Sequence, residues 1–338
     1  AHLTPGVAAA VCRGPRRSSL TYAAVQKRSA ALARGLLRQE ELHQPVASRP
    51  PVIAVHLPRT HVDFVPLLVA ASRAGLPFIL LSTDLPDHAL QNGRNQFIVD
   101  TLKPWLRVTA SGSAAATANL ATDRKIAVVA VEQLAVETPE AVQTPARAGA
   151  ELLCFMFTGG TQRTKIVEAT HAMVLHERAA YHDLWQPRTS QAVVLAHTSV
   201  YWGASALGQL SIALAFGGTA VWTEATDVAE LRRCVTEESV TVLGVVPDHL
   251  DLLAPQSPAS ELPNIEVVFT WGERLPQRVS GRWRNHPRAV VRELLIATEY
   301  WLSLWADPLG DGTLRLVRNT ELFILKEGGE AAGVGELG

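Results

Sequence analysis

The sequence has few cysteines and almost no net charge. Its 338 residues include three cysteines, Cys12, Cys154 and Cys234, which lie far apart in the chain. An odd and scattered set argues against a disulfide framework and a zinc cluster, and favours a reducing compartment such as the cytoplasm. The 31 Lys and Arg residues are balanced by 32 Asp and Glu residues. We therefore expect no nucleic-acid partner and no anionic membrane partner.

Long apolar runs are also absent. A membrane-spanning helix needs roughly 20 consecutive apolar residues. Gly217, Gly218 and neighbouring polar positions interrupt the longest run here. Residues 1–5 lack the charged start of a signal peptide. The chain begins with Ala1 and stops at Gly338, which leads us to expect a piece of a longer protein.

What is present is a pattern of alternating strands and helices. Apolar residues make up 47% of the chain and charged residues 19%, as in a globular protein. Buried-strand runs such as 52–57 and 240–246 alternate with amphipathic segments, which predicts α/β architecture with parallel sheets covered on both faces. We expect one α/β subdomain over 1–150, a second over 151–305, and the start of a small β-barrel over 306–338.

The most informative stretch is the loop after the apolar run at 152–157. The pair Gly159 and Gly160 allows positive φ and lets several backbone N–H groups face one anion. Further donors and a positive charge come from Thr158, Thr161 and Lys165. This chemistry suits a nucleotide phosphate, although a flexible surface loop with two glycines remains an alternative. Thr164 stands where a Walker loop has glycine, so this is not a Walker loop.

Several segments together resemble the adenylate-forming superfamily, which includes adenylation domains of nonribosomal peptide synthetases and acyl- and aryl-CoA ligases. Residues 20–23 resemble the opening of "LTYxE". Residues 57–60 and 72–86 resemble "LPRS … LKAGAAYVPLD … P". The loop 157–165 resembles "YTSGSTGxPKG", and the pair Thr170 and His171 matches the "TH" that follows. The order and spacing of these fragments cover nearly the whole chain, and the peptide-synthetase adenylation domains are the nearest resemblance.

The resemblance implies a site for ATP and Mg²⁺. Thr158, Gly159, Gly160, Thr161 and Lys165 would line the phosphate side of ATP. The family's "NxYGPTE" segment ends at Thr298 and Glu299, so Thr298 would lie beside the α-phosphate. Glu299 would hold Mg²⁺, a cation that prefers carboxylate oxygen, with Thr161 as a second metal contact. Lys165, Thr298 and Glu299 are thus the candidate catalytic residues, although a solvated surface carboxylate remains an alternative for Glu299.

The adenine and the acid would occupy neighbouring sites. Residues 271–273, Trp271, Gly272 and Glu273, resemble the "GGE" strand end beside adenine, and Leu295 begins the segment that replaces "YGP". The acid pocket of the family begins where "FDxSVWE" would fall, at residues 196–202. There His197 replaces the Asp that pairs with an α-ammonium group, which favours a carboxylic acid without an α-amine. A core histidine is an equal alternative.

An aromatic and apolar set would complete the acid pocket, although such clusters are more often core. It comprises Tyr201, Trp202, Leu294, Leu302 and Ser303.

The sequence also departs from the family pattern. The glycine loop is short and contains Gln162 and Arg163, and residues 295–297 lack the aromatic ring expected beside adenine. The chain stops before the ribose-binding Asp and the mobile C-terminal domain with its catalytic Lys. Within a complete protein, we expect activation of a carboxylic or amino acid as an acyl-adenylate, followed by transfer to a carrier-protein phosphopantetheine or CoA thiol. The alternative is a degenerate, inactive binding or scaffold module.

Overall fold

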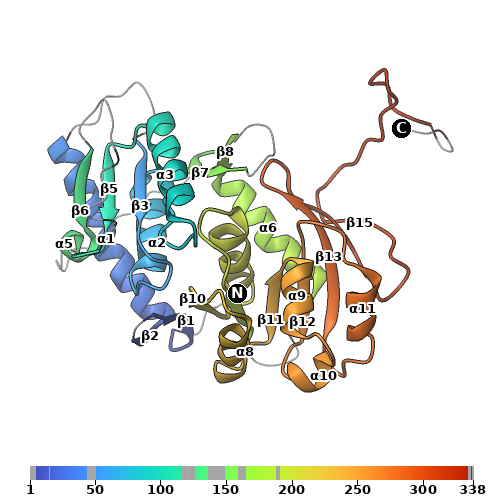
Figure 1. The fold of residues 1–338 in the computed structure, drawn as a ribbon. Coiled ribbons are helices and arrows are strands. Elements are labelled where there is room, and N and C mark those ends of the chain that lie inside the picture. The colour runs from blue at the N-terminus through green and yellow to red at the C-terminus, as the bar shows by residue number, and fades with distance from the viewer. Residues whose placement is uncertain are drawn as a thin grey trace.

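The structure is a computed structural model that describes residues 5–14, 16–43, 51–113, 115, 120, 126–135, 149–158, 165–187, 191–333 and 336. The described strands form two sheets (Figure 1). In spatial order, the strands of the six-stranded sheet are β6 (Ala127–Ala130), β5 (Leu106–Thr109), β3 (Ile53–His56), β4 (Phe78–Leu80), β7 (Leu152–Phe157) and β8 (Ile166–Thr170). All its pairs are parallel except the β7–β8 hairpin.

The nine-stranded sheet has a parallel centre and antiparallel edges. In spatial order, its strands are β15 (Arg315–Leu316), β14 (Trp301–Ala306), β13 (Val290–Ala297), β12 (Val267–Thr270), β11 (Val242–Val245), β9 (Val193–Ala196), β10 (Thr219–Thr223), β1 (Ala8–Arg13) and β2 (Arg17–Thr21). Every residue of β10, β11 and β12 is buried, as expected for parallel strands covered on both faces.

Helices cover both sheets. The described helices that precede β7 in the chain are α1 (Tyr22–His43), α2 (Phe64–Ala74), α3 (His88–Leu102) and α5 (Val131–Leu134). The later helices are α6 (His171–Leu184), the π-helix η1 (Ala204–Gln209), α7 (Leu210–Ala215), α8 (Val228–Glu237), α9 (Pro247–Leu253), α10 (Pro258–Glu261) and α11 (Gln277–Trp283). Figure 1 shows α6 near the centre, between the two halves. None of the helices in the described part of the chain has the length and apolarity to span a membrane.

Local sequence signals fix several helix ends. Asp87 caps α3 by accepting a hydrogen bond from Leu90 N, and Asp227 caps α8 in the same way from Glu230 N. The Thr170 side chain accepts from Met173 N at the start of α6. Gly75 ends α2 with φ of 71°, a left-handed conformation that glycine adopts without strain.

The two sheets share one apolar core. Phe64 of α2 and Trp222 of β10 are fully buried, and their rings meet edge to face with centroids 5.2 Å apart. The same core cluster contains Leu32 of α1 and Phe269 of β12. The sheets are therefore packed against each other through side chains rather than joined by a linker alone.

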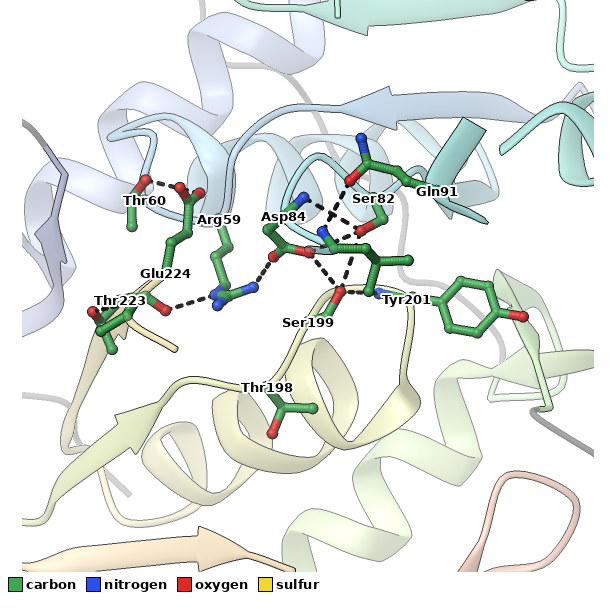
Figure 2. A network of polar contacts seen from close by, with 12 residues as sticks. Arg59, Thr60, Ser82, Asp84, Gln91, Thr198, Ser199, Tyr201, Thr223 and Glu224 are labelled. Atoms are coloured by element: carbon green, nitrogen blue, oxygen red, sulfur yellow. Dashed lines mark hydrogen bonds and ion pairs between the residues drawn. The ribbon is translucent and has the colours of Figure 1, made fainter. Parts of the chain in front are cut away.

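A buried polar network joins the carboxyl ends of the sheets (Figure 2). Arg59, which follows β3, forms an ion pair with Asp84, which follows β4. Arg59 Nε also donates to the carbonyl oxygen of Thr223, at the end of β10, over 2.7 Å. Ser199, after β9, donates to Asp84 Oδ1 over 2.5 Å, and Ser82 donates to the same oxygen over 2.8 Å. Burial lowers the pKa of Arg59 to about 10, so the guanidinium stays charged at neutral pH.

The sheet memberships cross the expected boundary at residue 150. Strands β1 and β2 belong to the nine-stranded sheet, while β7 and β8 belong to the six-stranded one. The division into 1–150, 151–305 and 306–338 stays a prediction. Residues 166–170 form β8, which pairs with β7 and directly precedes α6. Beyond β15, the described residues contain one isolated bridge between Leu325 and Ala331, so the expected β-barrel start also stays a prediction.

Replacing Arg59 tests the network. We expect Arg59→Met to lower the free energy of unfolding by about 3–5 kcal/mol, because it leaves the carboxylate of Asp84 buried without its partner. Urea denaturation measures this change. Arg233→Gln on α8 is the control, since its guanidinium is exposed and should leave stability unchanged. Equal midpoints for the two variants would contradict a structural role for the ion pair.

Candidate functional site

A cavity of about 540 Å³ lies at the carboxyl ends of the nine-stranded sheet's parallel strands. His197 follows β9, Val246 follows β11, Trp271 follows β12 and Ala297 ends β13, and all four line the cavity. In open α/β sheets ligands bind at this edge, because the loops there are free to vary around a rigid framework. The position alone makes the cavity the candidate site.

The predicted phosphate loop connects β7 to β8. Gly159, Gly160 and Thr161 lie outside the described residues. At the flanks of this stretch, Thr158 N donates to the carbonyl oxygen of Lys165 over 3.1 Å and extends the hairpin. The Thr158 hydroxyl is buried and has no hydrogen-bond partner among the described residues. A buried hydroxyl without a partner is costly, so a ligand oxygen at this position would be stabilising.

The structure brings the loop flank to the end of β13. Lys165 Nζ lies 3.7 Å from Glu299 Oε1, and both side chains are exposed to solvent. Thr298, the preceding residue, lines the cavity. Gly203 connects the two regions: a Cβ there would stand 2.0 Å from Met156 Cε of β7 and 3.9 Å from Thr298 Oγ1. Lys165 and Glu299 therefore meet next to Thr298, the one of these three residues that lines the cavity.

The residues predicted to flank adenine separate into two groups. Trp271 and Gly272 line the cavity, and Gly272 has φ of 94°, which favours glycine. The Trp271 ring lies directly over Gly244, where a Cβ would approach it to 2.4 Å. Glu273 and Leu295 are exposed and lie outside the described lining of the cavity. Of the four residues predicted near adenine, Trp271 and Gly272 thus lie on the cavity wall, whereas Glu273 and Leu295 lie away from it.

His197 is held neutral in a hydrogen-bonded chain. The Oε1 atom of Gln209 accepts from Thr198 N over 3.2 Å, so its Nε2 is the donor that faces His197 Nδ1, also over 3.2 Å. Because an amide nitrogen faces Nδ1, we assign the proton of neutral His197 to Nε2, which lies 3.1 Å from Nδ1 of the exposed His249. Burial, with the nearby charges of His249 and Arg59, lowers the pKa of His197 to about 3. An imidazole in this state offers an N–H donor and no negative charge.

The other predicted acid-pocket residues take different positions. Trp202 lines the cavity and is partly exposed, with its ring against that of Tyr201. Tyr201 itself is buried beneath Arg94, whose guanidinium lies 4.2 Å from the ring centroid. Further positions lie outside the described cavity wall: Leu294 and Leu302 in the core, and Ser303, which donates to Tyr300 O over 3.0 Å.

Sequence reasoning missed Glu177 and Tyr181 on α6, which line the cavity. The Tyr181 hydroxyl donates to Glu177 Oε1 over 3.2 Å, and both side chains are buried. Burial raises the pKa of Glu177 to about 8. The signal was present, because Glu177, Ala180, Tyr181 and Leu184 form a buried stripe at helical spacing. When a glutamate occupies such a stripe, its carboxyl group is directed into the core or into a binding site.

Unfolding measured against pH tests the protonation of Glu177. The folded protein keeps a proton on this group between pH 4.5 and about 8, whereas the unfolded chain releases it. The free energy of unfolding should therefore fall as pH rises through this window. We expect the fall in the wild type to exceed that in Glu177→Gln by at least about 1.4 kcal/mol, the value of one pKa unit. Parallel stability curves for the two proteins would contradict the buried neutral carboxyl.

His197 should act in the opposite direction. The unfolded chain binds a proton on this histidine below pH 6.5, but the folded protein does so only near pH 3. Its contribution to stability is thus lost as pH falls below 6.5. His197 is present in both the wild type and Glu177→Gln. Its effect on the free energy of unfolding at acid pH is therefore the same in both proteins and drops out of their difference.

Comparison with known proteins identifies the fold and the family. The profile described as AMP-binding enzyme matches residues 1–338, the whole chain. The structure is similar to apo MatB from Rhodopseudomonas palustris, with a TM-score of 0.79 at 17% identity, over 98% of this chain and 66% of that one. A structure of MatB with ATP bound is similar at a TM-score of 0.78 and 17% identity, with the same coverage. The two α/β halves with parallel sheets are thus those of adenylate-forming enzymes.

Two curated relatives are a synthase and a synthetase by name. Tyrocidine synthase 3 of Brevibacillus parabrevis is 25% identical over 231 residues, which is 62% of this chain. Malformin synthetase mlfA of Aspergillus neoniger is 26% identical over 276 residues, which is 80% of this chain. The chain spans 3% and 5% of the lengths of these relatives. Since the family profile covers every residue, the chain belongs to the family of AMP-binding enzymes.

Proposed function

We propose that this chain binds ATP and a carboxylic acid side by side and joins them as an acyl-adenylate. The observation that carries the proposal is the meeting of Lys165 and Glu299, 3.7 Å apart, beside a cavity that Thr298 lines. A carboxylate oxygen of the acid attacks the α-phosphorus of ATP, the bond from that phosphorus to the bridging oxygen breaks, and pyrophosphate leaves. Such a reaction depends mainly on positioning and charge neutralisation.

The phosphate groups would lie between the β7–β8 loop and the end of β13. Lys165 supplies a positive charge there, and the hydroxyl of Thr158, which has no hydrogen-bond partner among the described residues, supplies a donor. Gly159, Gly160 and Thr161 remain predicted phosphate contacts. Trp271 and Gly272 would face the adenine, because they form the cavity wall at the end of β12. Glu273 and Leu295 stay predictions for the outer rim of that subsite.

The residues present fit Mg²⁺ at Glu299, with most of its ligands supplied from outside the protein. Within the described residues, no group of three or more His, Cys, Asp or Glu side chains is placed to hold a metal. Mg²⁺ keeps several waters and is commonly bound by one or two carboxylates together with substrate phosphates. Glu299 is exposed beside the phosphate loop and meets this requirement, with Thr161 as the predicted second contact. The ion would neutralise charge on the phosphates.

The acid would enter the cavity with its carboxylate toward Thr298. His197, which carries its proton on Nε2, cannot pair with an α-ammonium group as an aspartate would. The cavity walls offer apolar surface from Trp202, Leu207 and Trp271 to the body of the acid. We therefore propose a carboxylic acid without a free α-amine as the substrate class.

The acyl group would then pass to a thiol, with loss of AMP. The phosphopantetheine of a carrier protein and coenzyme A both supply this thiol. The resemblance to peptide-synthetase adenylation domains supports the first, together with the similarity to tyrocidine synthase 3 and malformin synthetase. The second is supported by similarity of the fold to o-succinylbenzoate CoA synthetase from Bacillus subtilis, at a TM-score of 0.76 and 17% identity.

Titration calorimetry with ATP and Mg²⁺ tests the nucleotide site. We expect Glu299→Ala to weaken the binding of Mg-ATP by at least tenfold, or about 1.4 kcal/mol, because it removes the metal's protein ligand. Glu168→Ala on the neighbouring strand β8 is the matched control, since this exposed carboxylate lies outside the described cavity lining. Failure of the wild type to bind Mg-ATP, or equal loss in both variants, would contradict the proposal.

Pyrophosphate exchange separates the enzyme from its alternative. The assay uses the complete protein that contains this chain and a panel of acids with and without an α-amine. Exchange with acids that lack the α-amine supports adenylate formation. Binding of Mg-ATP without exchange for any acid would instead support a degenerate binding module.

A further inference from the structure

The candidate cavity contains a carboxyl group that adenylate chemistry does not require. Glu177 projects from α6 into a wall that is otherwise mostly apolar, with Met156, Leu207 and Ile296 among its members. Its side chain is 2% exposed. Among the described lining residues there is no Lys or Arg to pair with it. A buried carboxyl without a cationic partner is costly to ionise, so its place in a ligand cavity needs an explanation.

The hydrogen bonds of Glu177 leave part of the carboxyl available. The Tyr181 hydroxyl donates to Oε1 over 3.2 Å, and the backbone N–H of Leu302 is the other nearby donor. An ionised carboxylate has about four acceptor positions. Two donors from the protein therefore leave room for two more from a ligand in the cavity.

The aromatic rings of the cavity suit a cation. Trp271 and Trp301 are buried members of its lining, and Tyr181, whose hydroxyl donates to Glu177, adds a further ring. Indole faces attract ammonium groups, most strongly where water is excluded. The histidines of the cavity do not compete for Glu177 as cations, because His197 is neutral and His249 lies at the exposed side. Carboxylate and aromatic faces together form a site for an ammonium group.

The cavity lining is buried in one part and exposed in another. Glu177 and Tyr181 are buried, whereas Trp202 and Gly272 are exposed and Thr298 is partly exposed beside Glu299. In the proposed function, the reacting carboxylate lies near Thr298. A group that reaches Glu177 must therefore belong to the far end of the acid.

We propose that the cavity selects acids that carry a primary ammonium group remote from the reacting carboxylate, and that Glu177 is the residue that binds this group. The inference rests on the proposed function for the orientation of the acid. It differs from recognition of an α-amine, because the position that follows β9 is occupied by neutral His197. An acid with a second carboxylate at its far end is disfavoured, since that group would meet Glu177.

Binding should be linked to the release of a proton. Burial raises the pKa of Glu177 to about 8, so the empty cavity holds a neutral carboxyl at pH 7. The ammonium group stabilises the ionised form, and the carboxyl proton then leaves to solvent. Tyr181 and His197 are the other titratable groups of the buried wall, and both stay neutral at this pH.

Matched ligand pairs test the proposal on the wild-type chain with α,β-methylene-ATP and Mg²⁺ present. The pairs are 3-(aminomethyl)benzoate with 3-ethylbenzoate, and 6-aminohexanoate with heptanoate. We expect calorimetry at pH 7 to give at least tenfold tighter binding of the amino member of one pair. Equal affinities within both pairs would overturn the proposal, as would equally tight binding of 3-(hydroxymethyl)benzoate.

Variants and a spectrum identify the residue. Glu177→Gln should reduce the preference to near unity, and Glu168→Gln on β8 should preserve it. A preference that survives in Glu177→Gln would overturn the role of Glu177. If that variant does not fold, the infrared difference spectrum of the wild type decides, because the protonated-carboxyl band must disappear when the amino ligand binds. An unchanged band would overturn the proposal. If the wild-type protein does not bind α,β-methylene-ATP at all, that result would instead count against the proposed function.

Discussion

The arrangement of the site depends on the buried ion pair between Arg59 and Asp84. Each residue follows a strand of the six-stranded sheet, yet their partners belong to the nine-stranded one, since Thr223 ends β10 and Ser199 comes after β9. The charge pair thus fixes the carboxyl ends of one sheet against those of the other. Within the same segment, His197, Thr198, Ser199 itself and Trp202 line the cavity. A shift between the sheets would move His197 and Trp202 relative to the loop that follows β7.

Convergence of distant segments is the second feature of the site. Lys165 directly precedes β8 of the six-stranded sheet. Glu299 lies in the turn between the antiparallel strands β13 and β14 of the nine-stranded sheet. Close packing at Gly203 accompanies this approach, because a Cβ there would stand 2.0 Å from Cε at the flexible end of Met156. The cavity between these elements combines a charged, exposed rim with a buried aromatic interior. These two environments match the two needs of adenylate formation: neutralised phosphates and a desolvated acid.

The sequence predicted the α/β class and placed Lys165, Thr298 and Glu299 at strand ends, because motifs and strand ends are local patterns. It could not predict the pairing of β1 with β10, since partner choice depends on packing between segments far apart in the chain. The same limit affected the pocket. A register shift between Leu295 and Ile296 places Ile296 and Ala297 on the cavity wall, while Leu294 remains in the core. Glu177 was missed because the strands that complete its cavity come later in the chain.

The most direct test of the nucleotide cleft is a crystal structure with α,β-methylene-ATP and Mn²⁺ in place of Mg²⁺. The account predicts an anomalous manganese peak at coordination distance from the Glu299 carboxylate, with the phosphates between it and Lys165. The ion pair between those two residues would then be replaced by separate contacts to the ligand. A bound nucleotide whose phosphates and metal lie away from both residues would contradict the account.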